Sequence, residues 1–159
     1  MTVALEADTE NEPPDASSPT DAAVALLRRA GAGKPVSQSL HAVVIGHRTL
    51  PFVLALLEAG CTAVRSLRLD APAPDREMVD LAWVVGVRRA GDLAIALHAA
   101  RARIGRTGVV AVEGALGSAA ASRSRVRFLA RREGLVPCTF DASASSLVLE
   151  ARAPLALAA

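Results

Sequence analysis

The 159-residue sequence is 52% hydrophobic but only 3% aromatic, which excludes a disordered chain and requires a core of Ala, Val and Leu. No apolar run reaches the roughly 18–20 residues of a membrane span, and the acidic N-terminus lacks the basic region of a secretory signal, so we expect a cytoplasmic protein without a membrane partner. The formal net charge of +2 conceals an asymmetry, because residues 1–21 carry six acidic and no basic side chains.

Two cysteines, Cys61 and Cys138, lie far apart in the sequence, with no CxxC pair and no His/Cys cluster. This spacing does not match a zinc site, so we expect no metal. In a reducing cytoplasm both cysteines are expected to be free thiols.

The N-terminal segment predicts a tail followed by a helix. Residues 1–19 are polar and acidic with three prolines, which is typical of a disordered tail. Ser18 can cap a helix that has Pro19 at its first position, and the helix is expected to end at Gly31. We expect one domain over residues 20–153 and a short apolar tail over 154–159.

The central part of the sequence alternates between apolar strands and helices. LHAVVIG (40–46) is a continuous apolar run of buried-strand length, and Thr49 can cap a following helix that ends at Gly60. TAVRSLRLD (62–70) alternates in polarity, as expected of a strand near the edge of a sheet. VDLAWVVGV (79–87) is a second continuous apolar run and predicts a central strand.

The C-terminal half continues the alternation and then changes direction. Asp92 is expected to cap the helix LAIALHAARARI, which Gly105 closes. The next elements are a strand, a helix and two strands joined by a short loop, at 108–113, 122–133, 135–141 and 145–153. So short a link between the last two strands allows only an antiparallel hairpin. The whole pattern predicts an α/β domain with a mostly parallel sheet and helices on both faces.

From Leu40 to Ala153 this order resembles the class I S-adenosylmethionine-dependent methyltransferase fold. The resemblance covers about 115 residues; it rests on the central strand VDLAWVVGV, on GDLAIALHAARARIGRTGVVAVE, and on the final helix and reversed hairpin VRFLARREGLVPCTF…SSLVLEARAP. It implies a Rossmann-like three-layer sandwich that ends in an antiparallel hairpin.

Two departures from the family pattern affect the cofactor site that the resemblance implies. The family's first turn usually reads Glu/Asp-x-Gly-x-Gly-x-Gly, whereas here IGHRTLP keeps only Gly46. Those glycines let the backbone approach the methionine part of the cofactor. In addition, the few residues between Asp70 and Val79 leave no room for the helix, strand and helix that the family places there, so we expect one edge of the sheet to be missing.

Open α/β sheets bind ligands at the carboxyl ends of their strands. In this sequence those ends carry the candidate cofactor-binding residues Gly46, His47, Arg48, Asp70, Val87 and Arg88, followed by Arg89 and, on a later strand, Glu113. The resemblance implies that Asp70 stands where the family hydrogen-bonds the cofactor ribose. The alternative for each is a solvated turn or helix-end residue, and no catalytic residue can be assigned.

Arginines also gather on two predicted helices: Arg101, Arg103 and Arg106, then Arg123, Arg125, Arg127, Arg131 and Arg132. A basic surface for nucleic acid or an acidic protein is one interpretation, and a solvated basic face is the other. The scarcity of aromatics argues against base stacking, since Phe52, Phe128 and Phe140 are expected in the core.

Three hypotheses for function follow. The first is a non-catalytic methyltransferase-like domain, without a cofactor, that serves as a binding or regulatory module for a protein partner or a second copy of itself. The second is a minimal active methyltransferase that uses S-adenosylmethionine if the ancestral site survives. The third is a basic nucleic-acid-associated protein. A homodimer would cover the sheet edge that the missing segment exposes.

Overall fold

The computed structural model describes residues 18–35, 38–70, 77–113, 119–141 and 146–151. The predicted tail at 154–159 lies outside this part of the chain, as do residues 1–17 of the tail predicted at 1–19, whereas Ser18 and Pro19 belong to the start of α1. The described elements are α1 (Pro19–Ala30), β1 (His41–Gly46), α2 (Leu50–Glu58), β2 (Ala63–Leu67), β3 (Val79–Val85), α3 (Ala90–Arg101), β4 (Ile104–Val112), α4 (Ala119–Arg132), β5 (Leu135–Asp141) and β6 (Ser146–Ala151).

The strands form one six-stranded sheet in the order β2-β1-β3-β4-β6-β5. The first four run parallel, β6 is antiparallel to β4, and β5 is antiparallel to β6. The last two strands therefore form the predicted hairpin, with β6 inserted between β4 and β5. The predicted fold class is confirmed, and β2 is the edge strand of the described sheet.

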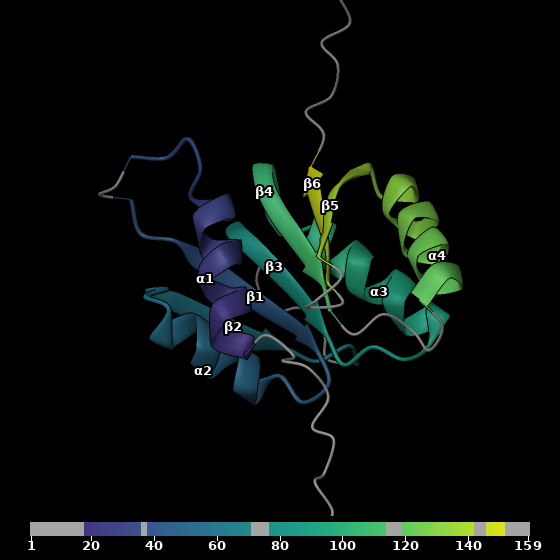
Figure 1. The fold of residues 1–159 in the computed structure, drawn as a ribbon, viewed down its shortest axis with the longest axis horizontal. Coiled ribbons are helices and arrows are strands. Elements are labelled where there is room, and N and C mark those ends of the chain that lie inside the picture. The colour runs from purple at the N-terminus through teal and green to yellow at the C-terminus, as the bar shows by residue number, and fades with distance from the viewer. Residues whose placement is uncertain (1–17, 36–37, 71–76, 114–118, 142–145, 152–159) are drawn as a thin grey trace, which may run out of the picture.

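Helices cover both faces of the sheet (Figure 1), which makes it the middle of three layers. Successive residues of the central strands point to opposite faces, so that Leu81, Trp83 and Val85 of β3 pack with α1 and α2, whereas Ala82 and Val84 pack with α3 and α4. This two-sided burial explains why the sequence of the central strands is continuously apolar rather than alternating.

The first helix begins as the sequence predicts. The Ser18 side chain accepts a hydrogen bond from the Asp21 N–H at 3.3 Å, and Pro19 occupies the first helical turn. The adjacent GAGK segment is held by an ion pair between Lys34 and Asp80, and Asp80 also accepts the His41 N–H at 2.9 Å. These contacts tie the loop after α1 to the start of β1 and to β3.

Two predicted helix boundaries are wrong, and a third is right without its capping bond. Thr49 is the N-cap residue of α2 as predicted, but its hydroxyl lies 2.6 Å from Ser66 Oγ and makes no capping bond. Asp92 lies inside the first turn of α3, which begins at Ala90 because the chain leaves β3 through a tight turn. Gly105 does not close α3 but belongs to β4, which pairs with β3 from Ile104 onward. Helix propensity alone does not locate the last residue of a helix, whereas strand pairing fixes where the next strand begins.

No helix in the described part of the chain is long and apolar enough to cross a membrane. In the homodimer that the sequence suggests, a second copy of the chain would cover the edge of the described sheet at β2. That association stays a prediction.

Candidate functional site

Two glycines hold the carboxyl ends of β1 and β3 against each other. Gly46 has φ +136°, and a Cβ at this position would overlap the Val85 carbonyl oxygen. Gly86 has φ +64°, and a Cβ there would lie 2.5 Å from the His47 carbonyl oxygen. The His47 N–H donates to the Val85 carbonyl at 3.3 Å. Only glycine permits this backbone contact, which fixes the turns after both strands.

Arg48 occupies the left-handed region with φ +51°, and it is the one non-glycine residue with a positive φ among the described residues. In the pattern Gly-x-Gly-x-Gly counted from Gly46, Arg48 takes the place of the second glycine. The backbone thus keeps a glycine-like conformation, which disfavours an L-residue by roughly 1–2 kcal/mol, while a long cationic side chain replaces a hydrogen atom.

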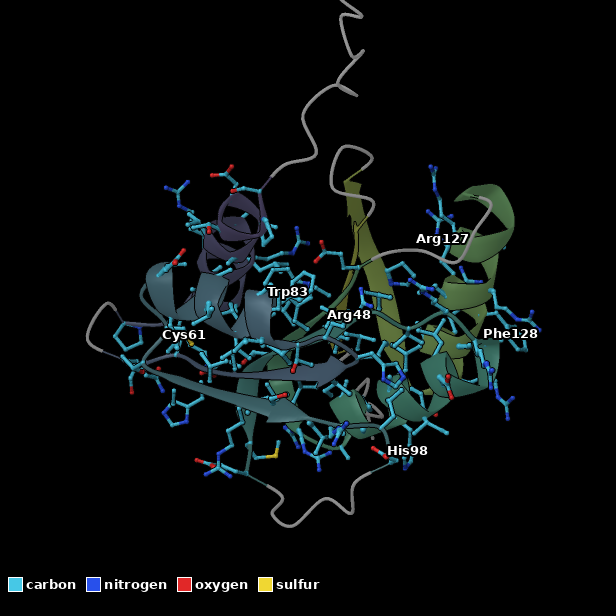
Figure 2. All side chains as sticks on the ribbon, turned by 90° about the horizontal axis from the view of Figure 1, so that it is seen from below. Arg48, Cys61, Trp83, His98, Arg127 and Phe128 are labelled. Carbon is cyan, nitrogen blue, oxygen red and sulfur yellow. The ribbon has the colours of Figure 1, made fainter. Side chains whose placement is uncertain are left out.

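These turns border a pocket of about 710 Å³, which we call the strand-end pocket. It lies at the carboxyl ends of β1, β2 and β3 and at the start of α3, beside Arg48 (labelled in Figure 2). Its lining residues are His47, Arg48, Leu69, Asp70, Gly86, Arg88, Arg89, Asp92 and Ile95. This volume falls within the range of small-molecule sites, so side chains do not fill the crevice.

The structure brings together four of the six candidate residues. His47, Arg48, Asp70 and Arg88 line the strand-end pocket. Gly46 and Val87 do not, because both are buried: Gly46 against Val85, and Val87 in the core beneath α3 and α4.

The sequence reasoning missed two side chains of α3, Asp92 and Ile95, which also line the pocket. The signal for them was present, since a helix that begins directly after the β3 turn must bring its first two turns to the same edge of the sheet. We expected Asp92 to be a helix cap, so Asp92 and Ile95 were not assigned to the site.

The pocket is electropositive. Its lining includes three arginines and two aspartates, which leaves one net positive charge when histidine is counted as neutral. They are Arg48, Arg88, Arg89, Asp70 and Asp92. Among the described residues, none of these five charged side chains forms an ion pair within 4 Å. The arginines are therefore available to a ligand that carries carboxylate or phosphate oxygens, for which a guanidinium offers paired donors.

Glu113 follows β4 at the same edge of the sheet but does not line the strand-end pocket. Its N–H donates to the Val84 carbonyl at 2.9 Å. Burial raises the pKa of its carboxyl to about 7. Glu113 Oε2 and Trp83 Nε1 are both buried, and neither has a hydrogen-bond partner within the described residues.

This shift predicts a pH-dependent stability. The folded pKa of Glu113 lies above its ordinary value of 4.5, so the folded chain retains a proton that the unfolded chain loses. The stabilising contribution is full below pH 4.5 and is lost as the pH rises to about 7. With solvent screening allowed for, we expect the free energy of unfolding to fall by about 1–2 kcal/mol across this interval.

Chemical denaturation of the chain and of Glu113→Gln at pH 5 and pH 8 measures this contribution. The variant lacks the titrating group, so the difference between the two proteins isolates Glu113 from the three histidines. An equal pH dependence in both would contradict the assignment.

Cys61 is a free thiol buried beneath α2. Its Sγ donates to the Leu40 carbonyl at 3.2 Å, and burial raises its pKa. A thiol that is protonated and enclosed in this way is a structural side chain rather than a nucleophile. The side chain of Cys138 lies outside the described residues.

The strand order, the reversed hairpin and a pocket at the strand ends together define a fold of the class I S-adenosylmethionine-dependent methyltransferase type. No protein-family model and no curated protein matches the sequence. The structure is similar to that of CalS10, an amino pentose methyltransferase from Micromonospora echinaspora with S-adenosylmethionine bound (TM-score 0.59, 11% identity, covering 85% of this chain and 92% of that one).

Two further solved structures extend this likeness. One is the ribosomal protein L11 methylase of Lactobacillus delbrueckii subsp. bulgaricus (TM-score 0.62, 8% identity, 85% of this chain and 77% of that one). The other is the 1,6-didemethyltoxoflavin-N1-methyltransferase of Burkholderia thailandensis with S-adenosylhomocysteine bound (TM-score 0.60, 10% identity, 86% and 79%). At such low identities the likeness establishes a methyltransferase-like Rossmann fold.

Proposed function

We propose that the chain is a non-catalytic methyltransferase-like domain that acts as a binding module, and that its strand-end pocket takes a small anionic ligand. The observation that carries this proposal is the environment of Arg48. Its side chain lines the pocket from a position where the resembled family has glycine, and Arg88 and Arg89 lie on the wall contributed by the β3–α3 turn.

The residues present fit S-adenosylmethionine at one end only. Asp70 lines the pocket at the end of β2, where a carboxylate can accept hydrogen bonds from ribose hydroxyls. At the other end, Arg48 lines the pocket at a position where the resembled family has a glycine that leaves room for the methionine part. The cofactor also carries a sulfonium cation, which three unpaired arginines would repel. No methyl-transfer step is therefore derived for these residues.

An active methyltransferase is the second candidate, favoured by one observation. The pocket remains open with a volume of about 710 Å³ and keeps Asp70 at its rim. If Arg48 turned toward solvent, the same cavity would admit the cofactor, and the domain would bind S-adenosylmethionine through an atypical turn.

Isothermal titration calorimetry separates the two candidates. We expect no measurable binding of S-adenosylmethionine or S-adenosylhomocysteine up to about 1 mM, and binding of inorganic pyrophosphate, used as a probe for anionic ligands. Arg88→Ala should weaken pyrophosphate binding by about tenfold, because a charge-assisted hydrogen bond is lost.

Arg68→Ala is the matched control, since Arg68 is exposed and does not line the pocket. It should bind pyrophosphate like the unaltered chain. Micromolar binding of either methionine-derived compound would overturn the proposal in favour of the active enzyme.

A further inference from the structure

Helix α4 presents a strongly basic surface to solvent. The helix contains no acidic residue between Ala119 and Arg132. Five of its exposed side chains, which we call the α4 basic face, are Arg125, Arg127, Phe128, Arg131 and Arg132. The opposite side of the helix buries Val126 and Ala130 against α3 and β5.

Phe128 lies at the middle of this face. With 3.6 residues per helical turn, Arg127 and Arg131 fall on one side of Phe128, and Arg125 and Arg132 fall on the other. The Phe128 side chain is 62% exposed, and Figure 2 shows it and Arg127 on the outer side of α4. The expectation that Phe128 belongs to the core is therefore wrong. One of the arguments against base stacking no longer holds.

The carboxylates of the described residues do not neutralise the charges of the α4 basic face. Glu133, the nearest acid in sequence, is engaged by His98, with Nδ1 and Oε2 3.1 Å apart. Within the described residues, none of the four arginines forms an ion pair with a carboxylate. An unpaired cluster of four guanidinium groups around an exposed aromatic ring is complementary to a polyanion that also carries flat rings.

We infer that the α4 basic face binds single-stranded nucleic acid, with the arginines on phosphates and Phe128 stacked on a base. Stacking on an exposed aromatic flanked by cations tolerates any sequence, because every base has a π-face. An acidic protein segment would satisfy the arginines but would gain little from Phe128. This surface lies on a different helix from the strand-end pocket, so the inference stands apart from the proposed function.

Fluorescence anisotropy with a labelled oligouridylate of about 20 nucleotides tests the inference on the full chain. Four phosphate contacts predict that affinity falls by about fiftyfold between roughly 50 and 200 mM salt. Phe128→Ala should weaken binding at least about fivefold, and Arg127→Ser combined with Arg131→Ser should both weaken it and flatten the salt dependence.

Two control variants match these changes on the other side of the sheet. Leu54→Ala removes an exposed apolar side chain of α2, and Arg28→Ser removes an exposed arginine of α1. Both should leave RNA affinity unchanged. Each variant is first checked for an unaltered unfolding transition.

Three results would overturn the inference. They are no binding at low salt, equal binding by Phe128→Ala and the unaltered chain, or tighter binding of poly-glutamate than of RNA. The last outcome would assign the α4 basic face to an acidic protein instead.

Discussion

Replacing Gly46 with alanine is expected to lower the free energy of unfolding by about 4 kcal/mol or more, which for a domain of this size approaches the whole of its stability. Two effects add. The backbone at Gly46 has φ +136°, a conformation that L-residues rarely adopt, and the new Cβ would overlap the Val85 carbonyl oxygen. Because β1 and β3 are central strands, the backbone cannot move apart without breaking their pairing.

Gly60→Ala separates these two effects. Gly60 also has a positive φ, at +95°, but nothing lies within 4 Å of the position its Cβ would take. This variant should lose only about 1–3 kcal/mol, the cost of the conformation alone. Urea unfolding followed by circular dichroism measures both. Equal losses in the two variants would mean that β1 and β3 are not held as closely as the structure places them.

Trp83→Ala is expected to cost about 3–5 kcal/mol, the range for truncating a buried Trp. Trp83 is fully buried on the face of the sheet that α1 and α2 cover, and its ring meets Phe52 edge-on with centroids 5.0 Å apart. The packed neighbours of Trp83 are expected to relax only partly into the cavity left behind. Thermal and urea unfolding give the loss directly.

Phe128→Ala is the counterpart on the surface. Its side chain is 62% exposed, so the free energy of unfolding should change by no more than about 0.5 kcal/mol. A comparable loss in both variants would place Phe128 in the core and remove the basis for the α4 basic face.

These two aromatics show where sequence reasoning about the core succeeds and fails. Expecting Phe128 in the core followed residue type, whereas burial follows position. Trp83 sits in a strand with both faces covered, so every residue of that strand except the half-buried Asp80 is buried. Phe128 sits on a helix with a single buried stripe, and Val126 and Ala130 already occupy it. Helical periodicity would have identified the exposed position.

The order of strands and helices was predictable because each signal is local. Continuous apolar runs mark β1, β3 and β4, and the short link before β6 forces the hairpin. The pairing of β6 rather than β5 with β4 was not predicted, since no local pattern records which strand of a hairpin lies inside the sheet.

The location of the candidate site was predictable from the sequence, but its detailed geometry was not. The rule that ligands bind at strand ends located His47, Arg48, Asp70 and Arg88 together. It did not reveal that Arg48 retains the left-handed conformation of a glycine, nor that Gly46 serves strand contact rather than ligand approach. Both facts depend on how closely β1 and β3 pack, which a sequence does not record.

We propose that the strand-end pocket takes a small anionic ligand in place of a methionine-derived cofactor. Two-dimensional ¹⁵N–¹H NMR of the full chain tests it most directly, because backbone amide signals report each turn separately. We expect inorganic pyrophosphate to shift the signals of Arg48, Arg88 and Arg89, and S-adenosylhomocysteine at about 1 mM to leave those of Gly46, Asp70 and Gly86 in place. Saturable shifts of the latter three with micromolar S-adenosylhomocysteine would contradict it.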